Sequence, residues 1–409
     1  MDETVIAAAG FCLNYGQRQQ PVGGVLYINP NLSFNMENME LYMKNVLFHE
    51  ITHILAFSPN LFKYLGMLVS DRDSVYYVVS EKTLLKARQH FNCGTLPGVP
   101  LENQGGEGSI GSHWEARYML GDYMLSTDYG DTVISDITLA LFEDTGFYKV
   151  DYYSGGLFKF GKNGGCDFFN KKCISNGKPL TEEFCIIPSK PMCTQSRAVK
   201  GYCTIYNYAN SGIVIPSEFQ YFENRYYGGF SPADFCPVPM STNSKIDYFP
   251  ENCKVGTSTL SSEYGEKMGD SSFCFVSSLL PTSSSYNIIE RPICYEVKCN
   301  DYDKTIIVNI GELTVECPTS GGNITNPKGY KGYIICPKYI DICDFKDNKI
   351  CNEMFDCLSK KIQTDEDSLM YDPNDENFIR VDKRYLSGKN LIIKNYILFL
   401  LLLSYIFKL

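Results

Sequence analysis

Residues 45–58 read Asn-Val-Leu-Phe-His-Glu-Ile-Thr-His-Ile-Leu-Ala-Phe-Ser and contain the pattern H-E-x-x-H, with His49, Glu50 and His53 at its defined positions. Residues four apart in a helix lie one turn above each other, so the two histidines can point at one metal ion. Glu50 lies beside them, where it can hold a metal-bound water and accept its proton. Because a catalytic zinc takes three protein ligands and keeps one position open, a third ligand must come from elsewhere.

The residues around this pattern favour a helix. Apolar side chains recur at helical spacing on both sides of it. They are Leu41, Val46, Leu47, Ile51, Ile54 and Leu55. Ser58-Pro59 follows, and because proline cannot continue a helix, we predict that the helix stops there.

The chain has four histidines, which leaves two candidates for the third ligand. His113 lies in Gly-Ser-His-Trp-Glu-Ala-Arg at residues 111–117, and Met124 follows eleven residues later. His90 lies in a predicted polar helix, so we expect a solvated or structural role for it. A carboxylate third ligand remains an alternative, and it would come from Glu102, Glu107 or Glu115.

Taken in order, these motifs resemble the leishmanolysin family of metzincin metalloproteases. That family has H-E-x-x-H, a long insertion, a distant histidine in an S-H-W-E context and a methionine turn under the metal. A helix ending in a D-x-G-F-Y-like stretch comes next, and residues 135–148 match it. The likeness runs from about Gly23 to Pro239 and continues at residues 161–166, 220–222 and 234–238. Several motifs in the right order are far more specific than one H-E-x-x-H.

The resemblance implies an α+β fold. A metzincin-type zinc protease catalytic domain, with an incomplete N-terminal part, would precede a Cys-rich, disulfide-stapled C-terminal region. It also implies that His49, His53 and His113 hold one Zn²⁺ and that Glu50 is the catalytic base. Met124 would lie in the Met-turn and fill space below the metal without ligating it.

Two features depart from the family pattern. Ala56 stands where the family has glycine, and a positive φ there would strain the exit of the helix. Only 48 residues precede His49, whereas the family carries a signal peptide, a pro-segment and an N-terminal sheet before its zinc helix. We therefore expect that the natural beginning of the protein is missing from this chain.

Local patterns predict the other elements of the first 150 residues. Residues 1–22 are expected to be a remnant of the N-terminal subdomain, with a short helical piece near Ile6–Ala9. Gly23–Pro30 is predicted as a strand, which could edge the substrate cleft as in metzincins or lie in the core. A helix is predicted at Ser80–Phe91 and a loop at Gly94–Gly111. Trp114 is expected to be a buried anchor. A second helix is predicted at Ser135–Gly146, with Ser135 as N-cap and Gly146 beyond its end.

Charge and cysteine usage narrow the class of protein. The net charge is −10 and no basic patch is present, so nucleic acid is not an expected partner. Of 17 cysteines, 15 lie from Cys166 to Cys357, which predicts a disulfide framework made in an oxidising compartment. No C-x-x-C pairs indicate zinc fingers, Cys93 should join another cysteine, and the odd total leaves one thiol over. Asn31 and Asn323 begin N-glycosylation sequons.

We expect four regions. They are a partial metzincin catalytic domain at 1–150, a leishmanolysin-like C-terminal domain at 151–240, a Cys-rich region at 241–385 and a hydrophobic membrane-anchor tail at 386–409.

The tail has an apolar run of 12 residues, Tyr396–Phe407, whereas a membrane-spanning helix needs about 20. A short run behind the small pair Ser387-Gly388 and a polar spacer favours a GPI-anchor signal. A marginal transmembrane helix beginning at Leu391 is the alternative, and both would tether the protein to a membrane.

These observations predict a zinc-dependent endopeptidase that acts on proteins or peptides at the cell surface, with a role in cell adhesion. Two alternatives remain. One is a catalytically inactive surface adhesion or binding protein that keeps the protease fold. The other is a protease with a glutamate as third zinc ligand.

Overall fold

The computed structural model describes residues 6–343, apart from 16–19, 30–38, 72–74, 107, 128–131, 153–154, 157 and 242–251. Its mixture of helices and strands agrees with the predicted α+β class. The helices are α1 (Met39–Leu55), α2 (Pro59–Tyr64), α3 (Glu81–Phe91), α4 (Ala116–Met119), α5 (Asp136–Asp144), α6 (Asp167–Asn170) and α7 (Tyr339–Ile342).

The strands are mostly short. They are β1 (Ala7–Tyr15), β2 (Gln20–Ile28), β3 (Leu68–Ser70), β4 (Tyr76–Val78), β5 (Val99–Pro100), β6 (Ile174–Ser175), β7 (Lys178–Pro179), β8 (Pro191–Cys193), β9 (Lys200–Cys203), β10 (Tyr206–Asn207), β11 (Tyr227–Gly228), β12 (Pro239–Met240), β13 (Ser272–Ser277), β14 (Leu280–Pro281), β15 (Arg291–Asn300), β16 (Thr305–Ile310), β17 (Leu313–Cys317), β18 (Gly322–Thr325), β19 (Tyr330–Lys331) and β20 (Tyr333–Cys336).

The first two strands form an antiparallel pair in which Ala7 lies opposite Ile28. The helical piece predicted near Ile6–Ala9 is therefore wrong, because the backbone of this segment pairs with β2 instead of with itself. The strand predicted at Gly23–Pro30 exists, but it begins earlier, at Gln20, and ends at Ile28.

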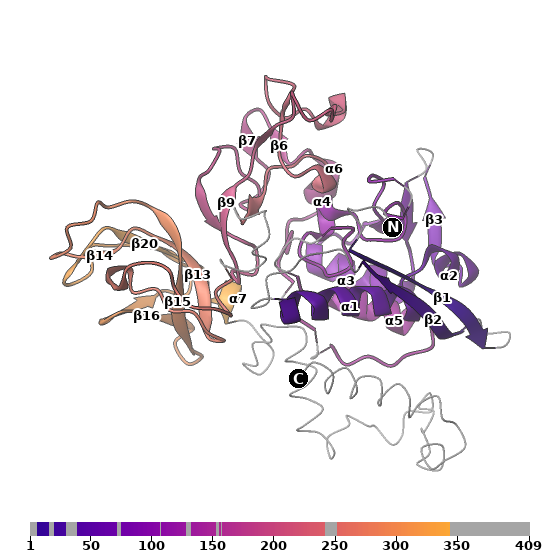
Figure 1. Ribbon diagram of the computed structural model, residues 1–409, viewed down its shortest axis with the longest axis horizontal. Helices are drawn as coiled ribbons and strands as arrows, with labels where there is room; N and C mark the ends of the chain where they lie inside the picture. Colours follow the sequence, from indigo (N-terminus) through magenta and orange to yellow (C-terminus); the bar gives the residue numbers. More distant parts are fainter. Residues whose placement is uncertain are drawn as a thin grey trace, which may run out of the picture. The chain divides into compact units, whose positions relative to one another are not determined.

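This strand pair packs on α1, and Figure 1 shows β1 and β2 running alongside that helix. The approach is close at Gly24. A Cβ built there would lie 2.5 Å from Cγ2 of Ile54 and 2.9 Å from the carbonyl oxygen of Gly10. Only glycine leaves room for so close a contact. The strand pair thus fixes α1 at the residue after His53.

The helix that carries H-E-x-x-H ends at Leu55, before the predicted stop at Ser58-Pro59. The backbone N–H of Phe57 donates to the carbonyl of Thr52 at 2.8 Å and closes the last turn. Ser58 is extended and begins α2, with Pro59 in the first turn of that helix. The serine-proline pair therefore starts a helix, because proline suits the first helical turn. Ala56 is not among the described residues with positive φ, so alanine is unstrained there.

The next two long helices, α3 and α5, pack on each other (Figure 1). The helix predicted at Ser80–Phe91 is confirmed, but the side chain of its N-cap residue Ser80 makes no capping bond. Asp144, at the end of α5, does so instead. Its carboxylate accepts from the N–H of Lys82 (3.0 Å), and from the N–H and hydroxyl of Thr83 (both 2.8 Å). One carboxylate thus caps α3 and joins it to α5.

We expect Asp144→Asn to lower the free energy of unfolding by about 1–2 kcal/mol. The amide keeps one acceptor oxygen but places an NH₂ donor against Thr83, which already donates two hydrogen bonds there. Denaturant unfolding of the oxidised protein measures this. The matched control is Asp136→Asn, because the Asp136 carboxylate is 42% exposed and lies 3.5 Å from Lys86, a pair worth at most about 1 kcal/mol. Equal losses in the two variants would contradict the capping role.

One hydrophobic cluster extends from Ala56 to Val238 and contains Trp114, which is fully buried as predicted. α5 contributes one face to this cluster. The hydroxyl of its N-cap residue Ser135 accepts from the N–H of Thr138, and Gly146 follows the helix with φ 73°. The predicted caps of this helix are therefore confirmed. In its described residues, the loop predicted at Gly94–Gly111 is confirmed except for the two-residue strand β5.

After residue 252 the chain forms an antiparallel sheet in the order β17-β16-β15-β13-β20-β18, shown in orange tones in Figure 1. The period of two is clear in β16, where Ile306, Val308 and Ile310 are fully buried and alternate with less buried residues. This sheet encloses its own hydrophobic cluster. The predicted domain limits near residues 150 and 240 remain predictions.

Seven disulfides staple the described chain. The pairs are Cys93–Cys166, Cys173–Cys236, Cys185–Cys203, Cys193–Cys274, Cys253–Cys294, Cys299–Cys343 and Cys317–Cys336. Among the described cysteines only Cys12 is free, and it is exposed. The predicted framework and the predicted bond of Cys93 are confirmed, whereas Cys351 and Cys357 lie outside the described residues.

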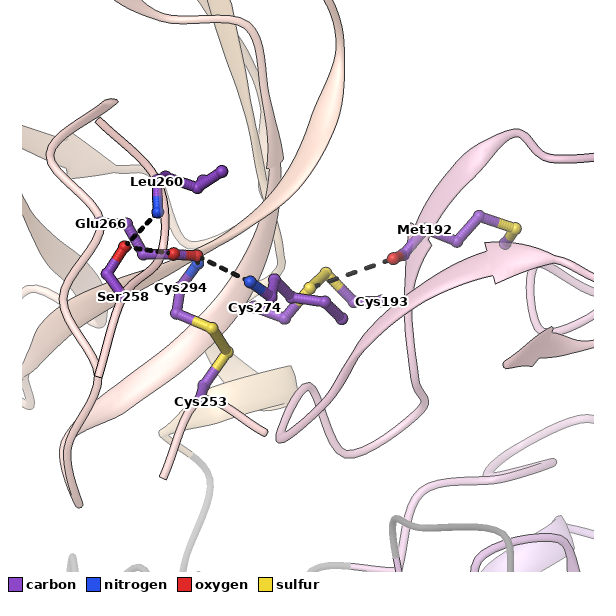
Figure 2. Close-up of polar contacts among 9 residues, drawn as sticks. Met192, Cys193, Cys253, Ser258, Leu260, Glu266, Cys274 and Cys294 are labelled. Atoms are coloured by element: carbon purple, nitrogen blue, oxygen red, sulfur yellow. Dashed lines mark hydrogen bonds and ion pairs between the residues drawn. A yellow bond between two sulfur atoms is a disulfide. The ribbon is translucent and has the colours of Figure 1, made fainter. Parts of the chain in front are cut away.

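Two of these bonds lie side by side, because Cys274 on β13 faces Cys294 on β15 across the sheet. Figure 2 shows Cys274 bonded to Cys193 and Cys294 bonded to Cys253. Next to them Glu266 accepts from the N–H of Cys294 at 3.1 Å. The same carboxylate pairs with Lys200 on β9 at 3.1 Å, with both side chains almost fully buried. Covalent and ionic contacts thus join the chain before residue 240 to the later sheet.

The predicted tail at 386–409 lies outside the described residues. Within the described residues, the structure has no helix that is both long and apolar enough to cross a bilayer.

Candidate metal centre

Three histidines from two distant parts of the chain meet at one point. His49 and His53 come from α1, and His113 comes from the segment between β5 and α4. Nε2 of His49 lies 3.0 Å from Nε2 of His53 and 3.2 Å from Nε2 of His113, and the last pair is 3.2 Å apart. Among the described residues, these three are the side chains that could hold a metal ion together.

The other ring nitrogen of each histidine, Nδ1, faces a main-chain carbonyl. The partners are Tyr123 for His49 (2.7 Å), Phe57 for His53 (2.9 Å) and Ser109 for His113 (3.2 Å). Nδ1 of His113 also lies 3.0 Å from the hydroxyl of Ser112, which donates its own proton to the carbonyl of Gly108 and so can accept from the imidazole. A carbonyl oxygen only accepts, so each Nδ1 carries the proton and each Nε2 is an unprotonated acceptor. Three lone pairs directed at one point repel each other unless a cation lies between them.

Burial keeps the three imidazoles neutral. The pKa of His49 is lowered to about 3, chiefly by burial and then by the neighbouring His53. Burial also lowers the pKa of His53 and that of His113. At neutral pH all three rings are therefore uncharged, which is the form that binds a metal.

The geometry fits a zinc ion. Zinc binds imidazole nitrogen at about 2.0–2.1 Å, so two ligands in a tetrahedral arrangement lie about 3.3 Å apart. The Nε2 atoms lie 3.0–3.2 Å apart. Three imidazoles are also a donor set of catalytic zinc sites, which keep the fourth position open.

Glu50 lies next to this cluster on α1 and is 7% exposed. Burial raises the pKa of its carboxyl group to about 7. A divalent cation at the histidines would act in the opposite direction, because it favours the ionised carboxylate. The side chain is thus in a position and an environment suited to accept and return a proton near neutral pH.

The segment from His113 to Met124 is anchored by its own backbone. The N–H of Trp114 donates to the carbonyl of Met124 at 2.9 Å, and the indole N–H donates to Thr138 at 2.8 Å. Trp114 and Met124 are both fully buried. That Met124 supports the metal from below remains a prediction.

The alternative ligands are engaged elsewhere. His90 lies apart from the three histidines: its Nε2 bonds the carbonyl of Phe160 at 2.9 Å, and its ring stacks on Phe158. Glu102 accepts from the N–H of Gln104, and Glu115 accepts from the N–H of Arg117. Neither carboxylate belongs to the metal-capable cluster of the described residues. The third candidate, Glu107, lies outside the described residues.

Sequence reasoning did not find the groups that orient the ligands. The carbonyls of Tyr123, Phe57 and Ser109 belong to the backbone and leave no mark in residue identity. Thr52, inside H-E-x-x-H, was also missed. Its hydroxyl lies 2.9 Å from the hydroxyl of Tyr123 and donates to the carbonyl of Phe48. The sequence offered one signal for the Tyr123 contacts, namely that Tyr123 directly precedes Met124 of the predicted Met-turn.

Comparison with known proteins gives the family. A family model described as leishmanolysin matches residues 1–349. The chain belongs to the leishmanolysin family. This confirms the family predicted from the motifs around His49, His53 and His113.

Individual relatives are distant but cover most of the chain. Leishmanolysin of Leishmania tropica is 27% identical over 361 residues, which cover 84% of this chain and 53% of that protein. Leishmanolysin-like peptidase of Drosophila pseudoobscura pseudoobscura is 28% identical over 301 residues, covering 65% and 44%. The Caenorhabditis briggsae protein of the same name is 26% identical over 422 residues, covering 83% and 63%. The chain spans about half the length of the curated leishmanolysins it matches.

Proposed function

We propose that this leishmanolysin-family chain is a zinc-dependent endopeptidase with a metzincin-type catalytic domain. His49, His53 and His113 hold the zinc, and Glu50 is the catalytic base. The observation that carries this proposal is the convergence of three unprotonated Nε2 atoms at 3.0–3.2 Å from one another. Zinc-dependent peptide hydrolysis uses three protein ligands, an open metal position and a carboxylate beside it.

The reaction follows from these groups. Bound zinc would polarise the scissile carbonyl and lower the pKa of a water towards about 7. Glu50 accepts the proton of the attacking water on a carboxylate oxygen and then donates it to the leaving amine nitrogen. The carbonyls of Tyr123, Phe57 and Ser109 keep the proton of each histidine on Nδ1, so that all three Nε2 atoms remain free to bind.

Removing the metal tests the proposal. Dialysis against a strong chelator should abolish peptidase activity, and zinc added back at one equivalent should restore it. The stapled fold should survive the treatment, because seven disulfides do not depend on the metal. Activity that persists in the metal-free protein would contradict the zinc mechanism. A zinc-loaded protein that cleaves no peptide would favour the inactive adhesion protein.

We also propose that the protein acts at the cell surface, where proteins or peptides are its substrates and adhesion is one of its roles. The disulfides support an oxidising compartment. Asn323 is exposed on β18 and begins a sequon, so it is the glycan acceptor we propose among the described residues. Mass spectrometry after glycosidase treatment tests this site, and an unmodified Asn323 in protein from the natural cell would refute it.

The hydrophobic tail is proposed as a GPI-anchor signal. Phosphatidylinositol-specific phospholipase should release the protein from cells. Retention of a mature form that still contains residues 398–403 would favour the transmembrane alternative instead.

A further inference from the structure

A buried carboxylate that the catalytic mechanism does not use lies next to Tyr123, whose carbonyl contacts the metal ligand His49. Asp122 precedes the Tyr123-Met124 turn and is fully buried. One carboxylate oxygen accepts from the N–H of Met124 at 2.8 Å. The other accepts from the N–H of Ser135 at 3.2 Å and from the hydroxyl of Thr138 at 2.7 Å. These donors are neutral, so the hydrogen bonds alone offset the burial of the carboxylate.

The turn that Asp122 holds orients the first zinc ligand. The carbonyl of Tyr123 and the N–H of Met124 belong to one peptide group. Because that N–H donates to the Asp122 side chain, the peptide group has little freedom to rotate. The carbonyl of Tyr123 therefore points at Nδ1 of His49, 2.7 Å away. The hydroxyl of the same tyrosine lies 2.9 Å from Thr52, on the helix between the two ligands.

The same carboxylate reaches the third ligand through Trp114, the residue after His113. The indole N–H donates to the Thr138 hydroxyl, which in turn donates to Asp122. The main-chain N–H of Trp114 donates to the carbonyl of Met124 in the turn. Both N–H groups of Trp114 thus donate to residues that are themselves hydrogen-bonded to Asp122, namely Thr138 and Met124. The network links ligands that are 64 residues apart in the chain.

We propose that Asp122 is a positioning residue of the metal centre: its carboxylate sets the Tyr123-Met124 turn and, through Thr138 and Trp114, aligns His49 and His113 for one ion. This proposal rests on the zinc site proposed above. Groups that orient metal ligands typically change affinity by about 10–100-fold when removed. Asp122 acts one layer further out, so its effect must pass through Tyr123 and Thr138.

The test uses Asp122→Asn, which keeps the shape but turns an NH₂ donor towards neighbours that themselves donate. Zinc affinity is measured by chelator competition, and the ligand geometry by the visible absorption spectrum of the Co²⁺-substituted protein. We expect zinc binding to weaken about 10-fold, at the lower end of that range, and the Co²⁺ spectrum to change in position or intensity. The melting temperature of the metal-free variant is recorded alongside.

Two matched comparisons separate positioning from general stability. Thr138→Val removes the hydroxyl at nearly constant shape and should change zinc affinity and the Co²⁺ spectrum, whereas Thr138→Ser restores both. Asp144→Asn removes another carboxylate that accepts three hydrogen bonds, at the α3–α5 contact. It should lower the melting temperature without changing affinity or spectrum.

An unchanged affinity and spectrum in Asp122→Asn would overturn the proposal. If that variant does not fold, the same result in Thr138→Val would overturn it. Failure of the unaltered protein to bind zinc would instead overturn the proposed function, so the two failures are distinguishable.

Discussion

Glu50→Gln is expected to abolish peptidase activity while the zinc content stays near that of the unaltered protein. Glutamine has the shape of glutamate but cannot accept the proton of the attacking water. General-base catalysis contributes about 10²–10⁴-fold, so the rate should fall by at least that range. Zinc should remain, because the ligands are the three histidines and Glu50 is outside the metal-capable cluster.

The measurement is a peptidase assay together with zinc analysis on the same preparation. Glu312→Gln is the matched control, because Glu312 is an exposed residue of the turn between β16 and β17. It should leave both quantities unchanged. Retained activity in Glu50→Gln would refute the base, and loss of zinc with the activity would indicate that Glu50 ligates the metal.

His113→Ala should weaken zinc binding by at least about 100-fold and abolish activity. The remaining pair, His49 and His53, leaves the metal with two protein ligands, one fewer than catalytic zinc sites use. Nε2 of His113 lies 3.2 Å from Nε2 of each of the other two histidines. The metal-capable cluster of the described residues has no fourth side chain that could replace it. Zinc stoichiometry after gel filtration and the chelator-competition constant measure the loss.

Two controls distinguish His113 from its rivals. His90→Ala should lower stability, because the ring is packed on Phe158 and bonded to Phe160, yet leave zinc content near the original value. Glu115→Ala should also retain zinc, since Glu115 lies outside the metal-capable cluster of the described residues. Should His113→Ala keep full zinc while Glu115→Ala loses it, the third ligand would be a carboxylate and the metzincin-type assignment would be wrong.

The helix of His49 and His53 could be predicted because the two ligands and their helix obey one local rule, the spacing of four residues. His113 could not be derived that way. Its 60-residue separation from His53 is closed by tertiary structure, and only its resemblance to a known motif indicated it. A helix cap was predictable where the capping side chain is next to the helix in sequence, as Ser135 is at the start of α5. At the start of α3 no cap was predicted, and the capping oxygen comes from Asp144, which is distant in the chain.

Other errors have similar causes. The run Ile6–Ala9 has the composition of a helix, but its residues pair with β2, the next strand of the chain, where Ala7 lies opposite Ile28. Ser58-Pro59 obeys two rules at once, since proline stops one helix and starts the next. The count of cysteines predicted the presence of disulfides, but not which sulfurs pair. The carbonyls that orient the ligands are invisible in sequence, because every residue has one.

If His49, His53 and His113 together hold one zinc ion, X-ray absorption at the zinc edge should detect all three, since it reports the ligand atoms and their distances. We expect three imidazole nitrogens at about 2.0–2.1 Å and one further light atom, with no sulfur. A sulfur shell near about 2.3 Å, or fewer than three imidazoles around the zinc, would contradict it.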